Sequence, residues 1–321
     1  MTGSVVSGRG VAVRYRIGKR VARAVDDVDI DVAGGEVVAL AGESGCGKTS
    51  LARALLGLEK PSAGVVSWRG VPLRYATKAL RPFHADVQFV PQDPAGALNP
   101  RHTVYEAVAE GLRIHRRGDE AAKVAEALEW VGLTPAKRFA DAYPRQLSGG
   151  QKQRVLIAGA LVLRPSLVIA DEPVASLDAS VRGEILALLL RLRDDFGTAC
   201  LLVTHDLSAA WSISDRTAIM YAGRIVETGA TTSVLTAPSH PYTKALLSVL
   251  PESGWDAPVV LRGEPPDATA IAPGCRFHPR CPALAEGAAE AVAASCRGKE
   301  LPVLPASGAH VACYLDDSCP A

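Results

Sequence analysis

The chain has 321 residues, of which 48% are hydrophobic, and its 35 basic and 34 acidic residues give a formal net charge of +1. This length allows one large core with a smaller appended unit, and the balanced charge argues against nucleic acid or anionic lipid as a partner. The most apolar stretch, at 185–190, is too short for a membrane span. Since the first ten residues do not resemble a secretory signal, we expect a cytoplasmic chain.

The N-terminal part of the sequence predicts strand, loop and helix in that order. Residues 11–32 have a strand-like pattern, and a glycine pair supplies a turn before an unbroken apolar run at 37–42. Such a run is typical of a buried strand in a parallel sheet. After a glycine-rich loop, apolar residues at helical spacing continue to about Gly57. This order of elements is the one that a phosphate-binding loop requires.

The glycine-rich loop from Gly42 to Thr49 has the sequence GESGCGKT. Its glycines let backbone N–H groups turn toward a phosphate, and the following helix presents its positive end. Lys48 is expected to neutralise the β and γ phosphates, and the Thr49 hydroxyl is placed to ligate Mg²⁺. The alternative, an ordinary glycine turn before a helix, does not account for the complete spacing. The predicted nucleotide-binding residues here are Gly42, Ser44, Gly45, Cys46, Gly47, Lys48, Thr49 and Ser50.

Helices and strands alternate in the next part of the chain. Residues from about 93 to 147 are mostly helical in pattern, and apolar strands follow at 167–173 and 199–206. A helix at about 180–196 separates these two strands. This alternation indicates an α/β core.

The first of these strands ends in an acidic pair, Asp171 and Glu172. Asp171 can hold Mg²⁺ through its water shell, and Glu172 can act as general base for an attacking water or position it. An acidic pair after a strand is also typical of a solvated turn. The presence of a phosphate loop in the same chain favours the catalytic interpretation.

A pentapeptide at 147–151, LSGGQ, begins a helix that ends before Pro165. A serine and two glycines at a helix start can offer hydroxyl and backbone donors to a γ-phosphate. A simple serine cap would account for Ser148 alone. With this pentapeptide the sequence resembles the ABC ATPase family, whose signature it matches, and the resemblance covers nearly the whole chain. It implies phosphate contacts from Ser148, Gly149, Gly150 and Gln151.

The resemblance also implies a fold and a domain organisation. The expected fold is α/β, a P-loop NTPase core of ABC ATPase type with a β subdomain, an inserted helical subdomain at about 93–165 and a small cysteine-rich C-terminal extension. The ATPase domain is expected at 1–250, and a proline-rich linker with the extension at 251–321. Since the sequence contains no internal repeat, we expect a single ATPase unit.

Further site residues follow from the resemblance, position by position. Gln92 matches a glutamine that senses Mg²⁺ and the attacking water, and Asp178 matches a residue that communicates across a dimer. His205 matches the histidine that can hydrogen-bond the γ-phosphate, although a lone histidine at a strand end is more often structural. Tyr15 resembles the aromatic that stacks on adenine, and an ordinary strand aromatic is the alternative. Gly159 departs from the family, since relatives usually have arginine there.

The resemblance implies an assembly. ABC ATPases dimerise head to tail, so that the phosphate loop of one subunit faces the LSGGQ of the other, with ATP and Mg²⁺ between them. The dimer drives two transmembrane permease subunits, which receive substrate from an extracytoplasmic binding protein. The chain would therefore lie peripherally on the cytoplasmic face of the cell membrane.

Two segments narrow the resemblance to one subfamily. Residues 92–101 and 240–251 closely resemble the peptide and nickel importers, in which two non-identical ATPases work together, and the first segment looks most like the second ATPase of that pair. The implied function is ATP hydrolysis that powers uptake of di- or oligopeptides. Nickel and oligosaccharides stay open as substrates. A non-transport ABC ATPase is the alternative from another class, but such proteins generally carry tandem cassettes or long coiled-coil insertions.

The C-terminal part of the sequence is rich in proline and then in cysteine. Seven prolines fall between 251 and 282, which favours an irregular linker. Cys275, Cys281, Cys296 and Cys313 match the cysteines of the subfamily's C-terminal extension, and four thiolates can enclose a [4Fe–4S] cluster or a zinc ion. We expect the cluster, because the wide spacing without a CxxC pair is atypical of zinc sites. Reduced cysteines or a disulfide are the alternative.

Overall fold

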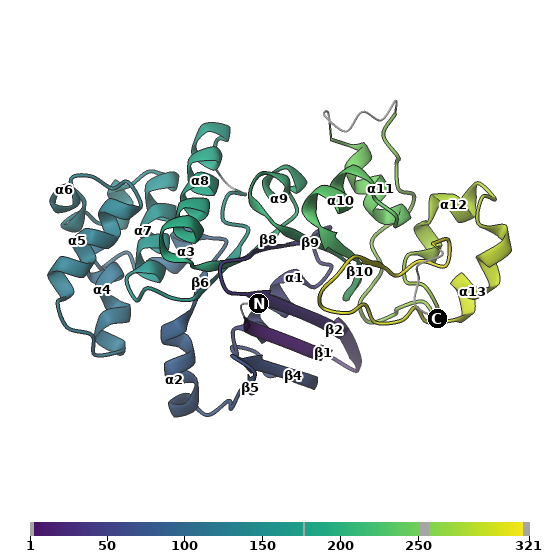
Figure 1. The fold of residues 1–321 in the computed structure, drawn as a ribbon, viewed down its shortest axis with the longest axis horizontal. Helices are drawn as coiled ribbons and strands as arrows, with labels where there is room; N and C mark the ends of the chain where they lie inside the picture. Colours follow the sequence, from purple (N-terminus) through teal and green to yellow (C-terminus); the bar gives the residue numbers. More distant parts are fainter. Residues whose placement is uncertain (1–2, 176, 251–256, 317–321) are drawn as a thin grey trace.

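The computed structural model describes residues 3–175, 177–250 and 257–316, and it contains two β-sheets with helices around them (Figure 1). The smaller sheet is antiparallel with strand order β2-β1-β4-β5. Its strands are β1 (Ser4–Ile17), β2 (Arg20–Ala33), β4 (Ala63–Trp68) and β5 (Val71–Pro72). The predicted strand pattern at 11–32 is therefore confirmed as a long hairpin.

The larger sheet has seven strands in the order β11-β10-β9-β3-β8-β7-β6. Its strands are β3 (Val37–Ala41), β6 (Val87–Val90), β7 (Leu167–Asp171), β8 (Ala199–Thr204), β9 (Arg216–Tyr221), β10 (Arg224–Ala230) and β11 (His310–Val311). From β6 to β9 neighbouring strands are parallel, whereas β10 runs antiparallel to β9 and β11. Every residue of β3, β7 and β8 is buried, as expected for parallel strands covered on both faces.

Helices follow most strands of the larger sheet. Those that pack around it are α1 (Lys48–Leu55), α2 (Thr77–Asp86), α8 (Ala179–Phe196), α9 (Leu207–Ile213), α10 (Thr231–Thr236) and α11 (Pro241–Ser248). The predicted helices after the phosphate loop and at about 180–196 are both present.

Between β6 and β7 the described chain forms helices and no strand. They are α3 (Pro94–Ala97), α4 (Val104–Ile114), α5 (Glu120–Trp130), α6 (Ala136–Ala140), a 3₁₀ turn (Pro144–Gln146) and α7 (Gly149–Leu161). Helices α4, α5 and α7 pack against one another and gather at one end of the molecule (Figure 1). Their apolar residues form a cluster that continues into α8 and β7, so this helical end shares a core with the sheet.

The C-terminal segment packs onto the opposite end of the larger sheet (Figure 1). Residues 257–277 contain no helix or strand, and beyond them lie a 3₁₀ turn (His278–Arg280), α12 (Pro282–Ala285), a second 3₁₀ turn (Glu290–Val292) and α13 (Ala293–Gly298). Strand β11 then pairs with β10 through Val311 opposite Glu227. The C-terminal segment therefore adds the edge strand of the larger sheet.

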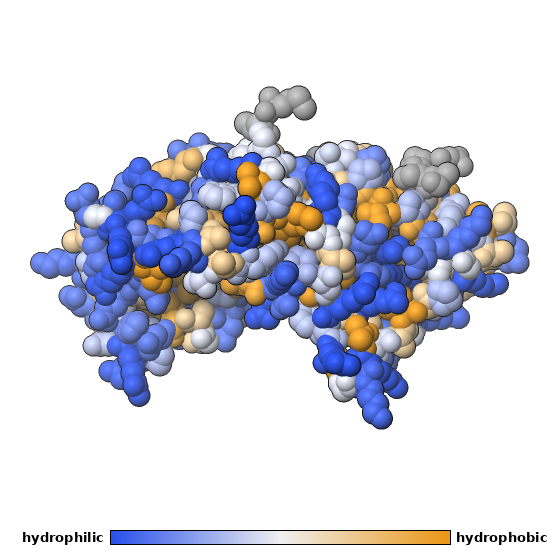
Figure 2. All heavy atoms as spheres, turned by 90° about the horizontal axis from the view of Figure 1, so that it is seen from below, coloured by the Kyte–Doolittle hydropathy of each residue, from blue (hydrophilic) through white to orange (hydrophobic). Residues whose placement is uncertain are grey.

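The surface alternates between hydrophilic and apolar regions. On the face seen in Figure 2, apolar atoms gather in patches toward the middle of the molecule, whereas the end that holds α4 to α6 is mostly hydrophilic. Among the helices of the described residues, none has the length and apolar character that crossing a membrane would need.

A buried histidine at the start of α11 predicts a pH-dependent stability. His240 Nδ1 accepts a hydrogen bond from the backbone N–H of Tyr242 at 3.0 Å, and burial lowers the pKa of His240 to about 3. Because the unfolded chain takes up this proton below a pKa of about 6.5, the free energy of unfolding should fall as pH drops below that value, by up to ~1.4 kcal/mol per pH unit. Urea unfolding at pH 7.5, 6 and 5 measures the slope.

Two variants separate the contribution of His240 to this pH dependence from that of another histidine. An asparagine at 240 keeps an acceptor for Tyr242 and removes the titration, so His240→Asn should flatten this slope. His310→Asn, at the sheet edge, should leave the slope in place. A slope that is equal in both variants would contradict the assignment to His240.

Candidate nucleotide-binding site

The phosphate loop joins the end of β3 to the start of α1, where backbone geometry requires glycine. Gly47 has φ of 111°, and a side chain there would overlap the carbonyl oxygen of Ala24. Gly42 has φ of 153°, and a side chain there would overlap the carbonyl oxygen of Met220. Glycine is needed at both positions because the loop runs directly against β2 and β9.

The lysine of the loop is fixed by the loop itself. Lys48 is buried, and its Nζ donates to the carbonyl oxygens of Gly42 at 2.8 Å and Glu43 at 3.0 Å. The Cys46 thiol lies 4.0 Å from the same Nζ. The ammonium group is thus held across the loop, where it can exchange carbonyl partners for phosphate oxygens.

A cavity of about 550 Å³ opens over this loop. It is lined by Ala24, Gly42, Glu43, Ser44, Gly45, Gly47, Lys48, Thr49, Ser50, Gln92, Glu172, His205, Leu246 and Ala268. The structure therefore brings together most of the predicted nucleotide-binding residues, including Gln92, Glu172 and His205 from three separate strand ends. Leu246 and Ala268, from the C-terminal third, carry no sequence signal that points to this cavity.

Asp171 and Thr49 supply oxygen atoms that suit Mg²⁺. Burial raises the pKa of Asp171, and a hydrogen bond from the Thr49 hydroxyl opposes that shift. Asp171 Oδ1 is buried without a hydrogen-bond partner. A buried carboxylate oxygen that lacks a donor, beside a hydroxyl oxygen, fits an oxygen-preferring cation.

Glu172 and His205 form a hydrogen-bonded pair at the edge of the cavity. His205 Nδ1 lies 2.8 Å from Glu172 Oε1, and the side chains are 58% and 10% exposed respectively. Glu172 has φ of 47°, a left-handed conformation that is rare for a residue with a side chain. Its backbone N–H is fixed by the carbonyl of Val203 at 2.8 Å. The carboxylate is thus held in one place, with a histidine to orient it.

Other predicted site residues lie outside this cavity. Tyr15 pairs with Ala22 in the β1–β2 hairpin, and it is not among the residues that line the cavity. Ser148 begins α7, where its hydroxyl accepts from the N–H of Gln151 at 3.2 Å and the Gln151 side chain accepts from the N–H of Ser148 at 3.0 Å. Asp178 precedes α8 and is exposed. The LSGGQ segment of the chain therefore does not reach the chain's own phosphate loop.

The four cysteines expected to hold the cluster are buried and line one small cavity, together with His240 and Phe277. They are Cys275, Cys281, Cys296 and Cys313. Burial raises the pKa of Cys275 to about 12. Within the described ranges, however, no group of three or more cysteine, histidine or acidic side chains is arranged to hold a metal ion. The predicted iron–sulfur cluster therefore has no matching ligand set in this structure.

A phosphate loop, a carboxylate suited to Mg²⁺ and a glutamate–histidine pair around one cavity define a P-loop nucleoside triphosphatase. The family description "ABC transporter" matches residues 25–175, and "Oligopeptide/dipeptide transporter, C-terminal region" matches residues 226–287. A protein of Brucella abortus (strain 2308) named as a peptide import ATP-binding protein is 40% identical over 304 residues, which cover 93% of this chain and 88% of that relative. The chain belongs to the ABC transporter family of ATPases.

Other relatives and solved structures agree with this assignment. A peptide import ATP-binding protein of Brucella ovis is 38% identical over 90% of this chain and 92% of its own length. The dimeric ATP-binding cassette MJ0796 bound to ADP and Pi is 30% identical with a TM-score of 0.65, over 70% of this chain and 98% of that one. The cbiO1 protein from Clostridium perfringens is 28% identical with a TM-score of 0.66, over 73% and 92% of the two chains.

Proposed function

We propose that this chain binds and hydrolyses ATP with Mg²⁺ to power the import of di- or oligopeptides through an ABC transporter. The observation that carries the proposal is the cavity in which the phosphate loop, Gln92, Glu172 and His205 converge. The names of the relatives support peptides as the substrate class. Nickel and oligosaccharides are the competing substrates, since no residue of this chain would touch the transported molecule.

The chemistry assigns each cavity residue a role. Lys48 and the loop N–H groups bind the phosphates, while Thr49, Asp171 and Gln92 hold Mg²⁺, which supplies neutralising charge at the β and γ oxygens when it is bound. Glu172 takes the proton of the attacking water on the carboxylate, and His205 keeps that carboxylate oriented. Tyr15 would stack on adenine at the mouth of the site.

A second ATPase subunit would complete the site. Ser148 and Gly149 are exposed and lie outside the chain's own cavity, so the Ser148 hydroxyl and the Gly149 backbone N–H would be the donors to a γ-phosphate held by another polypeptide. Gly150 and Gln151 would approach the phosphate with them, and Asp178 would lie at the same interface. The dimeric MJ0796 cassette supports a pair of ATPase subunits, and we propose that the pair is a head-to-tail heterodimer.

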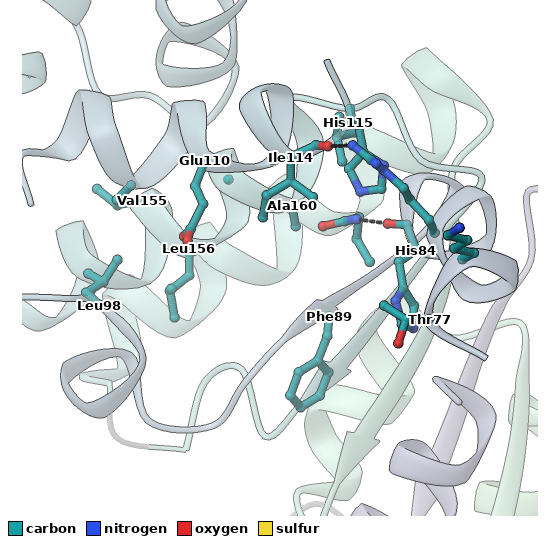
Figure 3. A pocket seen from close by; sticks show the side chains of 17 residues that line it. Thr77, His84, Phe89, Leu98, Glu110, Ile114, His115, Val155, Leu156 and Ala160 are labelled. Carbon is teal, nitrogen blue, oxygen red and sulfur yellow. Dashed lines mark hydrogen bonds between the residues drawn. The ribbon is translucent and has the colours of Figure 1, made fainter. Parts of the chain in front are cut away.

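The permease is proposed to dock in a groove beside the helical end. This groove has a volume of about 680 Å³ and lies between α2, β6, α4 and α7. Figure 3 shows Leu98, Val155 and Leu156 on one side of it and His84 and His115 on the other. The charged residues that line it are Lys78, Arg81 and Glu110. An apolar floor beside two cations suits an amphipathic segment that carries an acidic residue. Two permease subunits would then place the chain on the cytoplasmic face of the membrane.

Gly159, the residue that departs from the family pattern, lines this groove. A Cβ there would lie 3.7 Å from the nearest atom, the carbonyl oxygen of Ala107, which is ordinary van der Waals contact. The packing between α7 and α4 therefore does not demand glycine. Its absent side chain instead leaves room in the groove.

An exposed isoleucine at the groove tests the docking proposal. Ile114 ends α4, lines the groove and is 53% exposed, so Ile114→Asp should fold normally and lower recovery of the permease by about tenfold or more. Co-purification from membranes measures this loss, and ATP affinity should stay unchanged. Val71→Asp, 65% exposed on β5, is the matched control. Normal permease recovery by Ile114→Asp would refute docking at this groove.

The composition of the purified complex distinguishes transport from other functions. Affinity-tagged chain purified from membranes should bring a second ATPase, two permease subunits and an extracytoplasmic binding protein whose bound ligand is a peptide. Ribosomal or DNA-repair partners without a permease would overturn the importer, and a nickel or oligosaccharide ligand would replace only the substrate class.

The domain boundaries are part of this proposal. The ATPase domain would cover 1–250, with the helical subdomain at about 93–165, and the peptide-importer extension would cover 251–321. A [4Fe–4S] cluster on Cys275, Cys281, Cys296 and Cys313 stays a prediction without support from the side-chain geometry. Anaerobic purification followed by visible absorbance tests it, and a colourless, metal-free protein would exclude it.

A further inference from the structure

The C-terminal extension contacts the phosphate loop through one arginine. Arg280 ends the 3₁₀ turn that precedes Cys281, and its guanidinium donates twice to Glu43, from Nη1 to Oε2 at 2.8 Å and from Nη2 to Oε1 at 3.1 Å. The Arg280 side chain is 8% exposed and that of Glu43 is 26% exposed. A bidentate arginine–carboxylate pair that is largely buried fixes both the position and the orientation of the Glu43 side chain.

Glu43 is the second residue of the phosphate loop, and it is held from several directions. Its backbone N–H donates to the hydroxyl of Tyr242 at 2.8 Å, and its carbonyl accepts from Lys48 at 3.0 Å. The side chain is held by Arg280. One loop residue thus joins the phosphate-binding lysine to α11 and to the extension.

The turn that carries Arg280 rests on the same aromatic side chains that approach the loop. The ring of Phe277 lies 5.1 Å from that of Tyr221 and 5.4 Å from that of Tyr242, centroid to centroid. Arg280 Nη1 also lies 3.4 Å from the Tyr221 hydroxyl. A cluster of packed aromatic rings therefore connects the buried cysteine cavity to the phosphate loop.

The Arg280–Glu43 ion pair also changes the charge of the nucleotide cavity. Glu43 lines the cavity that would hold a triphosphate, so an unpaired carboxylate there would repel the nucleotide. The guanidinium of Arg280 stays ionised at any physiological pH and cancels that charge. The extension also forms part of the cavity wall, since Ala268 lines the cavity and its carbonyl accepts from the N–H of Arg23 at 2.9 Å.

We propose that Arg280 is a positioning residue of the nucleotide site, through which the C-terminal extension sets the conformation and charge of the phosphate loop via Glu43. The proposal rests on the ATP site proposed above. It gives the extension a function at the nucleotide site that needs no metal at its cysteines.

A double-mutant cycle tests this proposal, with ATP and Mg²⁺ titrated into the 321-residue chain and its variants by calorimetry. Arg280→Met should weaken ATP binding by about tenfold, because Glu43 is left both loose and unpaired. Arg280→Lys should recover part of that affinity, because lysine keeps the positive charge but cannot donate the two parallel hydrogen bonds of the guanidinium. In a Glu43→Gln background, Arg280→Met should change the affinity by less than about threefold, because the carboxylate it serves is gone.

A matched control separates loop positioning from attachment of the extension. Arg224 also reaches the extension, through the carbonyl of Leu301 at 3.0 Å and through Glu300, and it does not contact the phosphate loop. Arg224→Met should leave ATP affinity unchanged, and thermal melting without nucleotide shows whether each variant is folded.

Three results would overturn the proposal. They are unchanged ATP affinity in Arg280→Met, an equal loss with and without Glu43→Gln, and an equal loss in Arg224→Met. If the wild-type chain bound no ATP, the proposed ATP site would be refuted as well. ATP binding by the wild-type chain therefore shows whether a negative result concerns the site or only the role of Arg280.

Discussion

Glu172→Gln is expected to bind ATP and to lose about 10²- to 10⁴-fold in turnover, the range that removal of a general base produces. The amide has the shape of the carboxylate and can still contact His205, which lies 2.8 Å from Glu172 Oε1. It cannot take a proton from the attacking water. Because ATP then stays intact between two subunits, the closed dimer should accumulate.

Both measurements use the chain together with its partner ATPase subunit. Phosphate release at saturating ATP measures the loss of turnover, and size-exclusion chromatography with ATP measures the dimer. Glu184→Gln is the control, since Glu184 lies on the surface, 61% exposed, in an ion pair with Arg154. It should hydrolyse ATP at the rate of the unmodified chain. Near-normal hydrolysis by Glu172→Gln would show that another group activates the water.

The sequence was sufficient to predict the strand, loop and helix around Gly42 to Thr49 because these signals are local. A buried strand, a glycine loop and a helix start follow one another within 37–55, so the phosphate loop needs no long-range contact to be recognised. The contact between Glu172 and His205 was not predicted from the sequence, and the sheet topology accounts for it. Since β7 and β8 are adjacent parallel strands with Asp171 opposite Val203, the residues just beyond their ends lie side by side.

The end of the larger sheet that holds β9, β10 and β11 was not predictable from local sequence signals. Strands β9 and β10 form a hairpin with a tight turn at Ala222 and Gly223, and no strand was predicted from the sequence in this part of the chain. Strand β11 has only two residues, and its pairing with β10 depends on the packing of the whole extension. Tertiary contacts, which local propensity does not encode, decide these elements.

The contacts of the extension with the nucleotide site are the most distant in sequence. Arg280 and Glu43 are 237 positions apart, and Tyr242 and Glu43 are 199 apart. Nothing near Arg280 in the sequence indicates a carboxylate partner, and the neighbouring cysteines draw attention to metal binding instead. Only the fold places this turn beside the phosphate loop.

Lys48→Met should weaken ATP binding by about 100-fold. The substitution removes all the charge-assisted hydrogen bonds that the ammonium group would donate to phosphate oxygens. Methionine keeps the buried aliphatic stem, so packing around α1 should persist. The carbonyls of Gly42 and Glu43 lose their shared donor, and the loop should become looser even without nucleotide. Calorimetric titration with ATP and Mg²⁺ measures the affinity.

Lys60→Met is the control, since Lys60 is exposed just beyond α1 and does not line the cavity. Lys48→Met and Glu172→Gln separate ATP binding from hydrolysis, because the first should bind ATP weakly and the second should bind it without turnover. If Lys48→Met bound ATP like the unmodified chain, the cavity over the loop would not be the phosphate site. The Arg280 variants would then lose their basis too, because Arg280 acts on ATP only through the loop that Lys48 spans.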